Sequence, residues 1–533
     1  MTSTRRLKDE KIVGHLLAEV MPEDRGRWWT IPHLKRLNGL IFILLLSATT
    51  AGFDGSMMNG LQSLPVWRNY FGKPVGVHLG LINAIYPIGA VVSLPITSIL
   101  SDKFGRKFPI YFGLIGILVA SALQAATQNY AMLVVTRLIV GYFSVTAQAA
   151  SPVLLTELAY PTHRGRLTYL SNSFYFCGSV IAAWVTFGTR RIQSNACWRI
   201  PSALQVLCPL IQLSLLHLVP ESPRWLVSRG RTVEAQAFLA EYHCGGDQDH
   251  PLVQREVLEI QETIRLEKEN TNDQSWLSLL KTPGNRKRVA VGIMTGAWCQ
   301  LNGTLVVDYY LTLMLDSVGI TSATSQTLIN ACLQCLRWFT AIAGAQLVDV
   351  LGRRPLFLIS VASMLVSWMS LTTCAGVFAN DPDNHAAADA FVAFVFIFAM
   401  AFACCWVNMI VAYPVEIFPF ELRTKGVALT LATNYSFNFA SLFTNPVGMK
   451  NIGWKYYIVF DGFLVVIFTT IYFFFPETKG FSLEEIAKVF DGDKAVPDEE
   501  IINRASRKQL ERDGDAESET KAANTVQIEQ ADG

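Results

Sequence analysis

The chain has 533 residues, of which 51% are hydrophobic and only 16% are charged, and its formal net charge is +1. Soluble domains carry about 25% charged residues, so this composition excludes an ordinary soluble protein, a disordered chain and a collagen. The small net charge gives no electrostatic reason to expect a nucleic-acid partner. The apolar residues form long blocks, which indicates an all-α membrane protein.

Twelve of these blocks are long enough to cross a bilayer core of about 30 Å as helices. The first six predicted spans are 39–59, 79–100, 110–128, 131–151, 169–189 and 203–219. The last six are 289–313, 326–347, 356–378, 389–412, 427–447 and 456–475. A polar stretch with helical patterns separates the two sets, so we expect twelve transmembrane helices in two six-helix bundles.

The division of the chain follows from these spans. We expect an N-terminal segment at 1–38, a first bundle at 39–220, a cytoplasmic helical linker at 221–288, a second bundle at 289–476 and a tail at 477–533. The N-terminal segment lacks the apolar core of a signal peptide.

Lysine and arginine residues predict the orientation. If both termini are cytoplasmic, 35 of the 44 basic residues lie on that side and seven lie on the other. This asymmetry fits the excess of positive charge that cytoplasmic loops carry. The two remaining basic residues, Arg137 and Arg337, fall inside predicted spans.

An internal repeat relates the two halves. The pattern D-x-x-G-R-[RK] follows the second span from Asp102 to Lys107 and the eighth span from Asp349 to Arg354. After the fourth and tenth spans, a glutamate precedes an arginine by seven residues. Charge-assisted pairs among these groups could close the ends of neighbouring helices in each half. The predicted gating residues are Asp102, Arg106, Glu157, Arg164, Asp349, Arg353, Glu416 and Arg423. The alternative is that these charges only cap helices and set topology.

Two further motifs are highly specific. The first half ends in the run from Pro220 to Leu226, PESPRWL, and the second half ends in the run from Pro476 to Gly480, PETKG. With the repeated loops, they make the chain resemble the sugar porter family of the major facilitator superfamily over residues 39–485. The fungal lactose-permease and hexose-transporter branch is the most similar in appearance. The resemblance implies a central site exposed alternately to each face of the membrane.

Asp54 lies about 15 residues into the first predicted span, a depth at which an ionised carboxylate is costly unless it is paired or carries a proton. The resemblance implies that Asp54 faces Arg137 and that protonation of Asp54 couples proton uptake to sugar binding. The alternative is a fixed structural ion pair. We favour proton coupling, with the proton as the coupling ion.

The substrate residues are predicted from amide side chains, which can both donate to and accept from sugar hydroxyls. Gln300 matches a sugar ligand of the family, and Asn172 replaces a glutamine that the family has in the fifth span. Asn434 and Asn438 are further candidates in the eleventh span. Other positions depart from the family pattern, including Leu305, where the family has an asparagine.

Two departures from the family pattern add charge. Arg337 replaces a neutral asparagine in the eighth span, and Asp308 is added in the seventh. At 1.5 Å per residue their depths differ by roughly 10 Å, which argues against direct contact. We therefore predict Arg337 as a substrate-binding residue that favours an anionic or strongly hydrogen-bonding substrate. A buried pair with Asp308 is the alternative.

The sequence thus predicts a transporter and not an enzyme: a multi-pass plasma-membrane protein, monomeric in the lipid bilayer, that moves a small molecule. A sugar or related polar metabolite is the expected substrate. An organic acid or secondary metabolite is the first rival, and a sugar sensor that does not transport is the second. We expect no metal and no organic cofactor, because the one CxxC motif, Cys332 and Cys335, lies inside an apolar helix.

Overall fold

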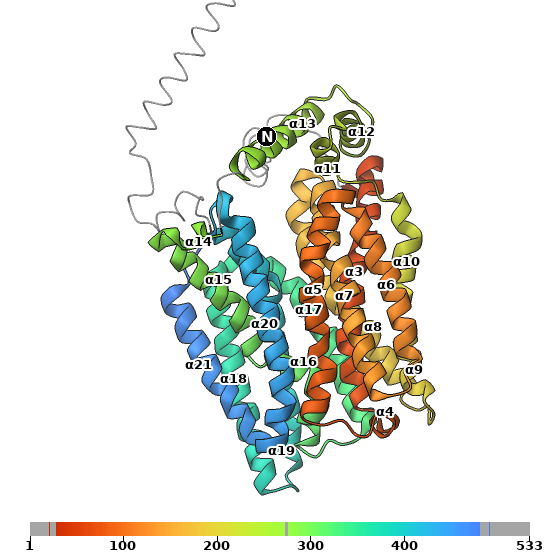
Figure 1. The fold of residues 1–533 in the computed structure, drawn as a ribbon. Coiled ribbons are helices and arrows are strands. Elements are labelled where there is room, and N and C mark those ends of the chain that lie inside the picture. The colour runs from red at the N-terminus through yellow and green to blue at the C-terminus, as the bar shows by residue number, and fades with distance from the viewer. Residues whose placement is uncertain (1–20, 22–27, 272–275, 480–489, 491–533) are drawn as a thin grey trace, which may run out of the picture.

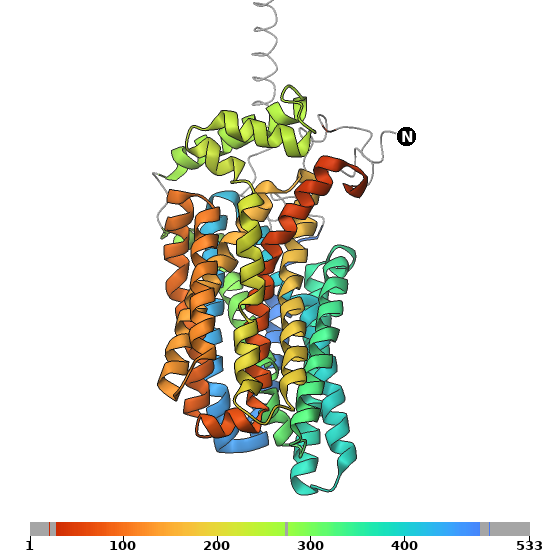
Figure 2. The same cartoon turned by 90° about the vertical axis from the view of Figure 1, so that its right-hand side faces the viewer.

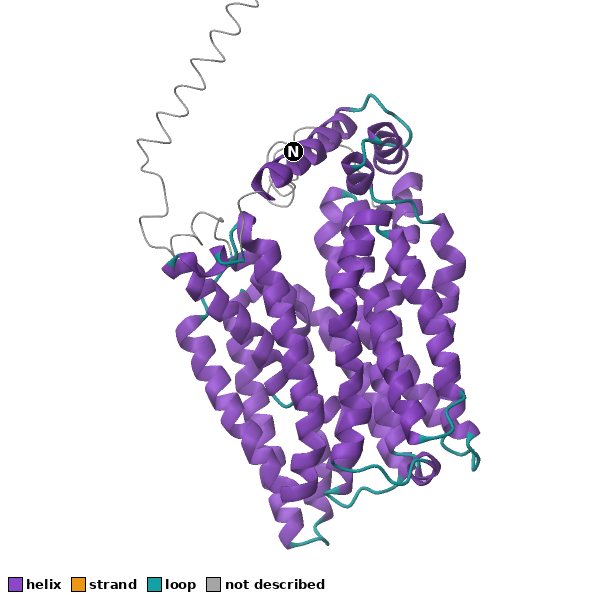
Figure 3. Cartoon of the chain, in the orientation of Figure 1, coloured by secondary structure: helices purple, strands orange, loops and turns teal. Residues whose placement is uncertain are grey.

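The fold is taken from a computed structural model, which describes residues 21, 28–271, 276–479 and 490. Within these ranges the regular elements are helices, and no strand occurs (Figure 3). They form two bundles that stand side by side, with a cap of short helices over one end (Figure 1). We call that end the linker end.

The first bundle is built from six crossings, of which the last is split into two helices. Its helices are α3 (Pro32–Gln62), α5 (Val77–Phe104), α6 (Lys107–Ala125), α7 (Tyr130–Leu158), α8 (Arg164–Thr189), α9 (Ala196–Leu204) and α10 (Leu207–Leu215). A short helix, α4 (Pro65–Tyr70), lies in the loop after α3 at the end away from the linker (Figure 1).

The second bundle repeats this plan, but its first crossing is the one that is split. Its helices are α15 (Pro283–Leu301), α16 (Thr304–Asp316), α17 (Ala323–Leu351), α18 (Arg353–Asn380), α19 (His385–Ile417), α20 (Phe420–Ile452) and α21 (Tyr457–Phe474).

Eleven apolar segments of the described chain are long enough to span a membrane. The last of them, Lys425–Phe474, contains most of α20 and all of α21, two helices that are joined by the turn Gly453–Tyr456. Counting these two separately gives twelve crossings, and the predicted twelve-helix fold is confirmed. Two of the predicted spans, 203–219 and 289–313, are interrupted and not continuous as the sequence suggested.

The linker forms the cap. It contains α11 (Pro223–Ser228), α12 (Thr232–His243), α13 (Pro251–Thr271) and α14 (Ser278–Lys281). Helices α11 and α12 lie over the first bundle, and α13 extends from them toward the second bundle (Figure 1); Figure 2 shows the same cap from the side. Helix α12 packs against α3, and Phe238 of α12 and Leu252 of α13 belong to one apolar cluster with Leu34 and Leu37 at the start of α3. The linker is therefore part of the packed structure of the first bundle.

Small residues allow the helices to approach closely. A Cβ atom at Gly52 of α3 would lie 1.7 Å from the carbonyl oxygen of Tyr175 in α8, and one at Gly344 of α17 would lie 2.1 Å from that of Cys404 in α19. Membrane helices use small residues in this way, because close backbone packing replaces the hydrophobic driving force that water provides.

The two bundles meet along paired helices: α5 packs against α20, and α8 packs against α17. Hydrogen bonds join the bundles toward the end away from the linker. Asn59 Nδ2 donates to Asn330 Oδ1 at 3.3 Å, and the Arg68 guanidinium contacts the Asp316 carboxylate at 3.0 Å. The structure therefore has polar contacts between bundles that hold this end together.

Candidate functional site

A buried ion pair lies inside the first bundle. Asp54 of α3 accepts a hydrogen bond from Arg137 Nη1 of α7 at 2.5 Å, and the exposed fractions of the two side chains are 1% and 0%. Gln205, at the break between α9 and α10, donates from Nε2 to the same carboxylate oxygen at 3.1 Å. The ring of Tyr86 lies 5.2 Å from the Arg137 guanidinium carbon. The structure thus brings together the two residues predicted for proton coupling.

The pairing of Arg137 is incomplete. Its Nε and Nη2 atoms are buried and have no hydrogen-bond partner among the described residues. A charged pair with unsatisfied donors is costly in a low-dielectric interior, so its free energy depends strongly on the protonation of its carboxylate. Protonation of Asp54 would remove the attraction that holds Arg137 in place. The pair can therefore exist in two states: Asp54 is ionised and bound to Arg137, or Asp54 is protonated and Arg137 is released.

A polar triad lies in the second bundle. Gln300 Nε2 donates to Asn434 Oδ1 at 2.6 Å, and Asn438 Nδ2 donates to Gln300 Oε1 at 3.1 Å. Gln300 is in the last turn of α15, and the two asparagines are one turn apart on α20. Three of the predicted substrate residues therefore share one network of amides.

The break after α15 positions this triad. Gly303 has φ = +91°, in the left-handed region that glycine adopts without strain, and it separates α15 from α16. A broken membrane helix leaves backbone groups and side chains free to line a site. Asn172, the remaining amide of the predicted set, lies on α8 and is half-buried, and no hydrogen bond in the described part of the chain joins it to the triad.

Arg337 and Asp308 form an ion pair through Arg337 Nη1 and Asp308 Oδ1. The expectation that their depths keep them apart is wrong. It assumed two regular helices, whereas α16 begins after the Gly303 break and leaves helical geometry again at Tyr310, with φ = −131° and ψ = 21°. Arg337 is 2% exposed and Asp308 is 23% exposed. Whether Arg337 also contacts substrate stays a prediction.

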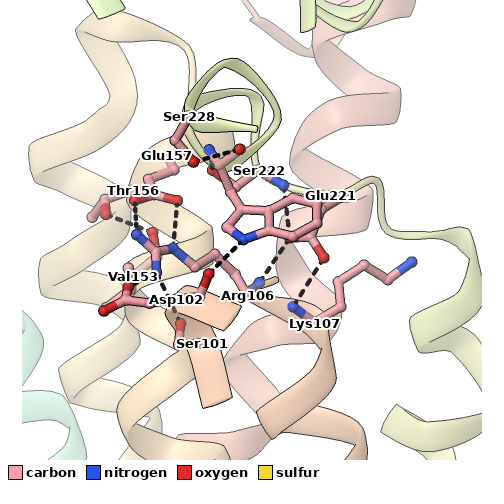
Figure 4. A network of polar contacts seen from close by, with 11 residues as sticks. Ser101, Asp102, Arg106, Lys107, Val153, Thr156, Glu157, Glu221, Ser222 and Ser228 are labelled. Carbon is pink, nitrogen blue, oxygen red and sulfur yellow. Dashed lines mark hydrogen bonds and ion pairs between the residues drawn. The ribbon is translucent and has the colours of Figure 1, made fainter. Parts of the chain in front are cut away.

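The repeated loop of the first half is a network at the linker end of the bundle (Figure 4). The Arg106 guanidinium contacts Asp102 at 2.8 Å and Glu157 of α7 at 3.3 Å. Glu221 of the PESPRWL motif accepts the backbone N–H groups of Arg106 at 3.0 Å and Lys107 at 3.3 Å. Figure 4 shows Glu221 beside the start of α6, where these N–H groups have no partner within the helix.

The second half contains the same network. Arg353 contacts Glu416 of α19 at 2.8 Å, and Glu477 of the PETKG motif accepts the backbone N–H groups of Arg353 at 2.9 Å and Arg354 at 3.0 Å. Glu221 and Glu477 therefore have one structural role in the two halves. The sequence motifs PESPRWL and PETKG were used only to recognise the family, and this capping role was not predicted. The glutamate at the second place of both motifs was the signal that could have suggested a shared role.

The other predicted gating residues lie at the same end. Arg164, at the start of α8, lies 3.7 Å from Glu256 of the linker helix α13, so it connects the bundle to the linker. Arg423 is in the first turn of α20. The side chain of Asp349 lies outside the described part of the structure.

The two capping glutamates differ electrostatically. Burial raises the pKa of Glu221, and the backbone donors and Lys107 offset that effect only in part. Burial also acts to raise the pKa of Glu477, but four backbone N–H donors outweigh it, so the pKa of Glu477 lies below its usual value. The network in the second half therefore depends more strongly on an ionised carboxylate.

Comparisons with known proteins agree with this architecture. Residues 40–490 match the family described as "Sugar (and other) transporter". The chain is 31% identical over 477 residues to a high-affinity glucose transporter of Kluyveromyces lactis, covering 86% of each chain. It is 30% identical over 447 residues to the MFS-type transporter oryC of Aspergillus oryzae, covering 82% of each.

Solved structures of the proton:xylose symporter XylE have the same fold. The form bound to 6-bromo-6-deoxy-D-glucose has a TM-score of 0.69 and 23% identity, covering 86% of this chain and 99% of that chain. An inward-open form of XylE from E. coli has a TM-score of 0.69 and 22% identity, covering 85% of this chain and all of that chain.

Proposed function

Because the chain belongs to the Sugar (and other) transporter family of the major facilitator superfamily, we propose that it carries a hexose or related sugar across the plasma membrane together with protons. The chain is a multi-pass membrane transporter and not an enzyme. Transport by alternating access needs two bundles that can move against each other around a central site. The repeated helical plan of the two halves supplies that symmetry.

The observation that carries the proposal is the Asp54–Arg137 pair. A carboxylate and a guanidinium, both fully buried in a membrane-spanning bundle, bond at 2.5 Å without satisfying the guanidinium. Ionisable groups within membrane-spanning helices are costly, and they mark ion pathways and proton relays in many transporters. Asp54 is the proton-binding residue in this proposal, and Arg137 responds to its charge.

The sugar site is proposed at the amide triad. Gln300, Asn434 and Asn438 satisfy one another in this structure, and each amide can instead donate to and accept from sugar hydroxyls. Asn172 of α8 would contribute from the opposite bundle. High-affinity glucose transporters among the relatives support a hexose as the first substrate to test.

The orientation and assembly are part of the proposal. The linker and both termini are cytoplasmic, as the distribution of basic residues indicates. Each copy contains both bundles and the complete set of predicted site residues, so we propose that a monomer is sufficient for transport.

One observation favours a second candidate, a non-sugar organic acid. Arg337 adds a cation to the middle of the membrane at a position where the resemblance implies a neutral residue. Its pairing with Asp308 neutralises that charge in this structure, which weakens the case for an anionic substrate. We therefore place sugars first.

The test is uptake of labelled glucose, xylose, lactose and small organic acids into cells that lack their own transporters, with and without a proton uncoupler. The proposal predicts that a hexose accumulates above its external concentration and that the uncoupler abolishes this accumulation. Uptake of an organic acid with no response to any sugar would replace the proposal with the second candidate.

A further inference from the structure

The Asp308–Arg337 pair has no assigned role. Asp308 lies on α16 and Arg337 on α17, so the pair belongs to the second bundle, whereas Asp54 and Arg137 belong to the first. An arginine at the centre of a membrane helix costs roughly 2.5–3.5 kcal/mol on insertion scales. A buried pair is not needed for stability, because apolar residues of similar volume are often as stable. The presence of the pair therefore calls for an explanation.

The two pairs share the bond between arginine and aspartate, although Asp54 also accepts a hydrogen bond from Gln205. In each, one guanidinium Nη1 donates to one carboxylate Oδ1. In each, the arginine Nε and Nη2 are buried with no hydrogen-bond partner among the described residues. The second pair differs in access, because the Asp308 side chain is 23% exposed whereas that of Asp54 is 1% exposed. Protons can therefore reach Asp308 more readily than Asp54.

The second pair also lies where the bundles meet. The Arg337 guanidinium carbon is 6.0 Å from the ring centre of Phe176 on α8, and α8 packs along α17 across the bundle interface. Phe176 forms a small apolar cluster with Ala341 and Ala403 of the second bundle. A change in the charge of this pair would therefore act on the surface along which the bundles move.

Two tyrosines interact electrostatically with the carboxylates of both pairs. A Cβ atom at Gly55, next to Asp54, would be 2.8 Å from the Tyr175 hydroxyl oxygen and 3.4 Å from that of Tyr309. Tyr309 directly follows Asp308, and both tyrosines are within electrostatic range of Asp54 and Asp308. The two carboxylates therefore belong to one electrostatic region at the centre of the protein.

We propose that Asp308 is a second proton-binding site, so that two protons accompany each sugar molecule. One proton enters on Asp54 and one on Asp308 from the same face of the membrane, and both leave to the opposite face with the sugar. For a neutral sugar the cycle moves two positive charges. The proposal rests on the proposed function, because it assumes proton-coupled sugar transport through Asp54.

The groups that face Asp308 define its electrostatic setting. Arg337 of α17 pairs with it, Tyr175 faces it from α8, Tyr309 is its neighbour on α16, and Cys299 faces it from α15. Arg337 is the group among these that carries a charge near neutral pH. Protonation of Asp308 would change the charge of the pair from zero to +1 at the bundle interface.

The test measures the charge that moves with each sugar. The purified full-length protein is reconstituted in vesicles with equal pH on both sides and a tenfold gradient of labelled glucose. The membrane potential at which net glucose flux stops is then determined. A tenfold gradient is balanced by about 59 mV if one charge moves and by about 30 mV if two charges move.

We expect a null potential of about 30 mV for the unmodified protein. The variants Asp54→Asn and Asp308→Asn with Arg337→Gln each remove one site, and each should shift the null potential to about 59 mV. Asp316→Asn is the matched control, because Asp316 is also an arginine-paired aspartate on α16 but lies at its end. It should leave the null potential unchanged.

The other outcomes overturn the proposal. A null potential of about 59 mV for both the unmodified protein and the Asp308–Arg337 variant would make the pair structural and leave the proposed function intact. If the variant does not fold, a null potential of about 59 mV for the unmodified protein is sufficient to overturn the proposal. An altered choice of sugar at a constant null potential would make the pair a substrate ligand. A glucose flux that does not change with the membrane potential would refute proton coupling itself.

Discussion

In the proposed site, the side-chain amides of individual residues recognise the sugar. Gln300 uses both ends of its side chain, donating to Asn434 and accepting from Asn438. These two bonds leave Asn434 Nδ2 and Asn438 Oδ1 outside the triad's own network, so these two atoms can bond to sugar hydroxyls without breaking it. Sugar hydroxyls could replace these bonds with others of similar strength, so specificity depends on geometry and not on charge.

Replacing Gln300 by alanine should weaken sugar binding about tenfold, which corresponds to about 1.4 kcal/mol and to the loss of one or two hydrogen bonds. Binding of labelled glucose to the purified protein measures this change. Thr433→Ala is the control, since the Thr433 hydroxyl donates to Leu429 of its own helix, next to Asn434. Equal affinities of the two variants would remove Gln300 from the sugar site.

At the scale of elements, the break between α15 and α16 shapes the site. Gly303 has a positive φ, and a Cβ atom there would lie 2.9 Å from the ring of Trp368 on α18. The break lets α16 follow its own path, and this path brings Asp308 to Arg337. The break thus lies between Gln300 of the triad and Asp308 of the second ion pair.

Gly303→Ala should destabilise the protein by roughly 1–3 kcal/mol, because alanine is strained at this φ and meets the Trp368 ring. Thermal unfolding in detergent should show a lower Tm than for the unmodified protein. The matched control is Gly462→Ala, since no atom lies within 4 Å of a Cβ atom at that position in α21. A Tm as high as that of the control variant would mean that the break does not need glycine.

The capping glutamates act at helix ends, and their opposite pKa shifts predict opposite pH dependences. The lowered pKa of Glu477 means that its carboxylate stabilises the fold above the unfolded value of about 4.5, and that this contribution is lost as pH falls through the lower native value. The Tm difference between the unmodified protein and Glu477→Gln should therefore be present at neutral pH and shrink in acid.

The matched comparison is Glu221→Gln. The pKa of Glu221 is raised, so the native state binds its proton more tightly than the unfolded state does. The unmodified protein should therefore gain stability relative to Glu221→Gln as pH falls. The Tm difference between the unmodified protein and Glu221→Gln should thus change with pH in the opposite direction to the difference for Glu477→Gln. If both differences change in the same direction, the pKa values of the two glutamates are not shifted in opposite directions.

At the scale of the whole molecule, the duplication explains what could be predicted. The apolar blocks and the paired motifs predicted the twelve-helix fold. The positions of Asp54 and Arg137 within predicted spans, together with the family resemblance, predicted that these two residues face each other. The Asp308–Arg337 contact was predicted only as the alternative, because counting residues along regular helices cannot show a break at Gly303 or a distortion at Tyr310. The roles of Glu221 and Glu477 were missed because they depend on backbone N–H groups distant in sequence.

Charged side chains of the two bundles form contacts at three levels along the molecule. Networks around Arg106 and Arg353 connect helix ends at the linker end, and the ion pairs Asp54–Arg137 and Asp308–Arg337 lie inside the bundles. Contacts such as Arg68 with Asp316 join the bundles at the opposite end. Proton binding at the inner level would then decide which end of the interface opens.

Proton movement driven by sugar is the most direct test of this account. Glucose is added to a lightly buffered suspension of vesicles that contain the purified protein, and the external pH is recorded. The account predicts that the medium becomes more alkaline as glucose enters and that an uncoupler abolishes this change. Glucose entry without any change in external pH would show facilitated diffusion and would contradict a proton-coupled role for the Asp54–Arg137 pair.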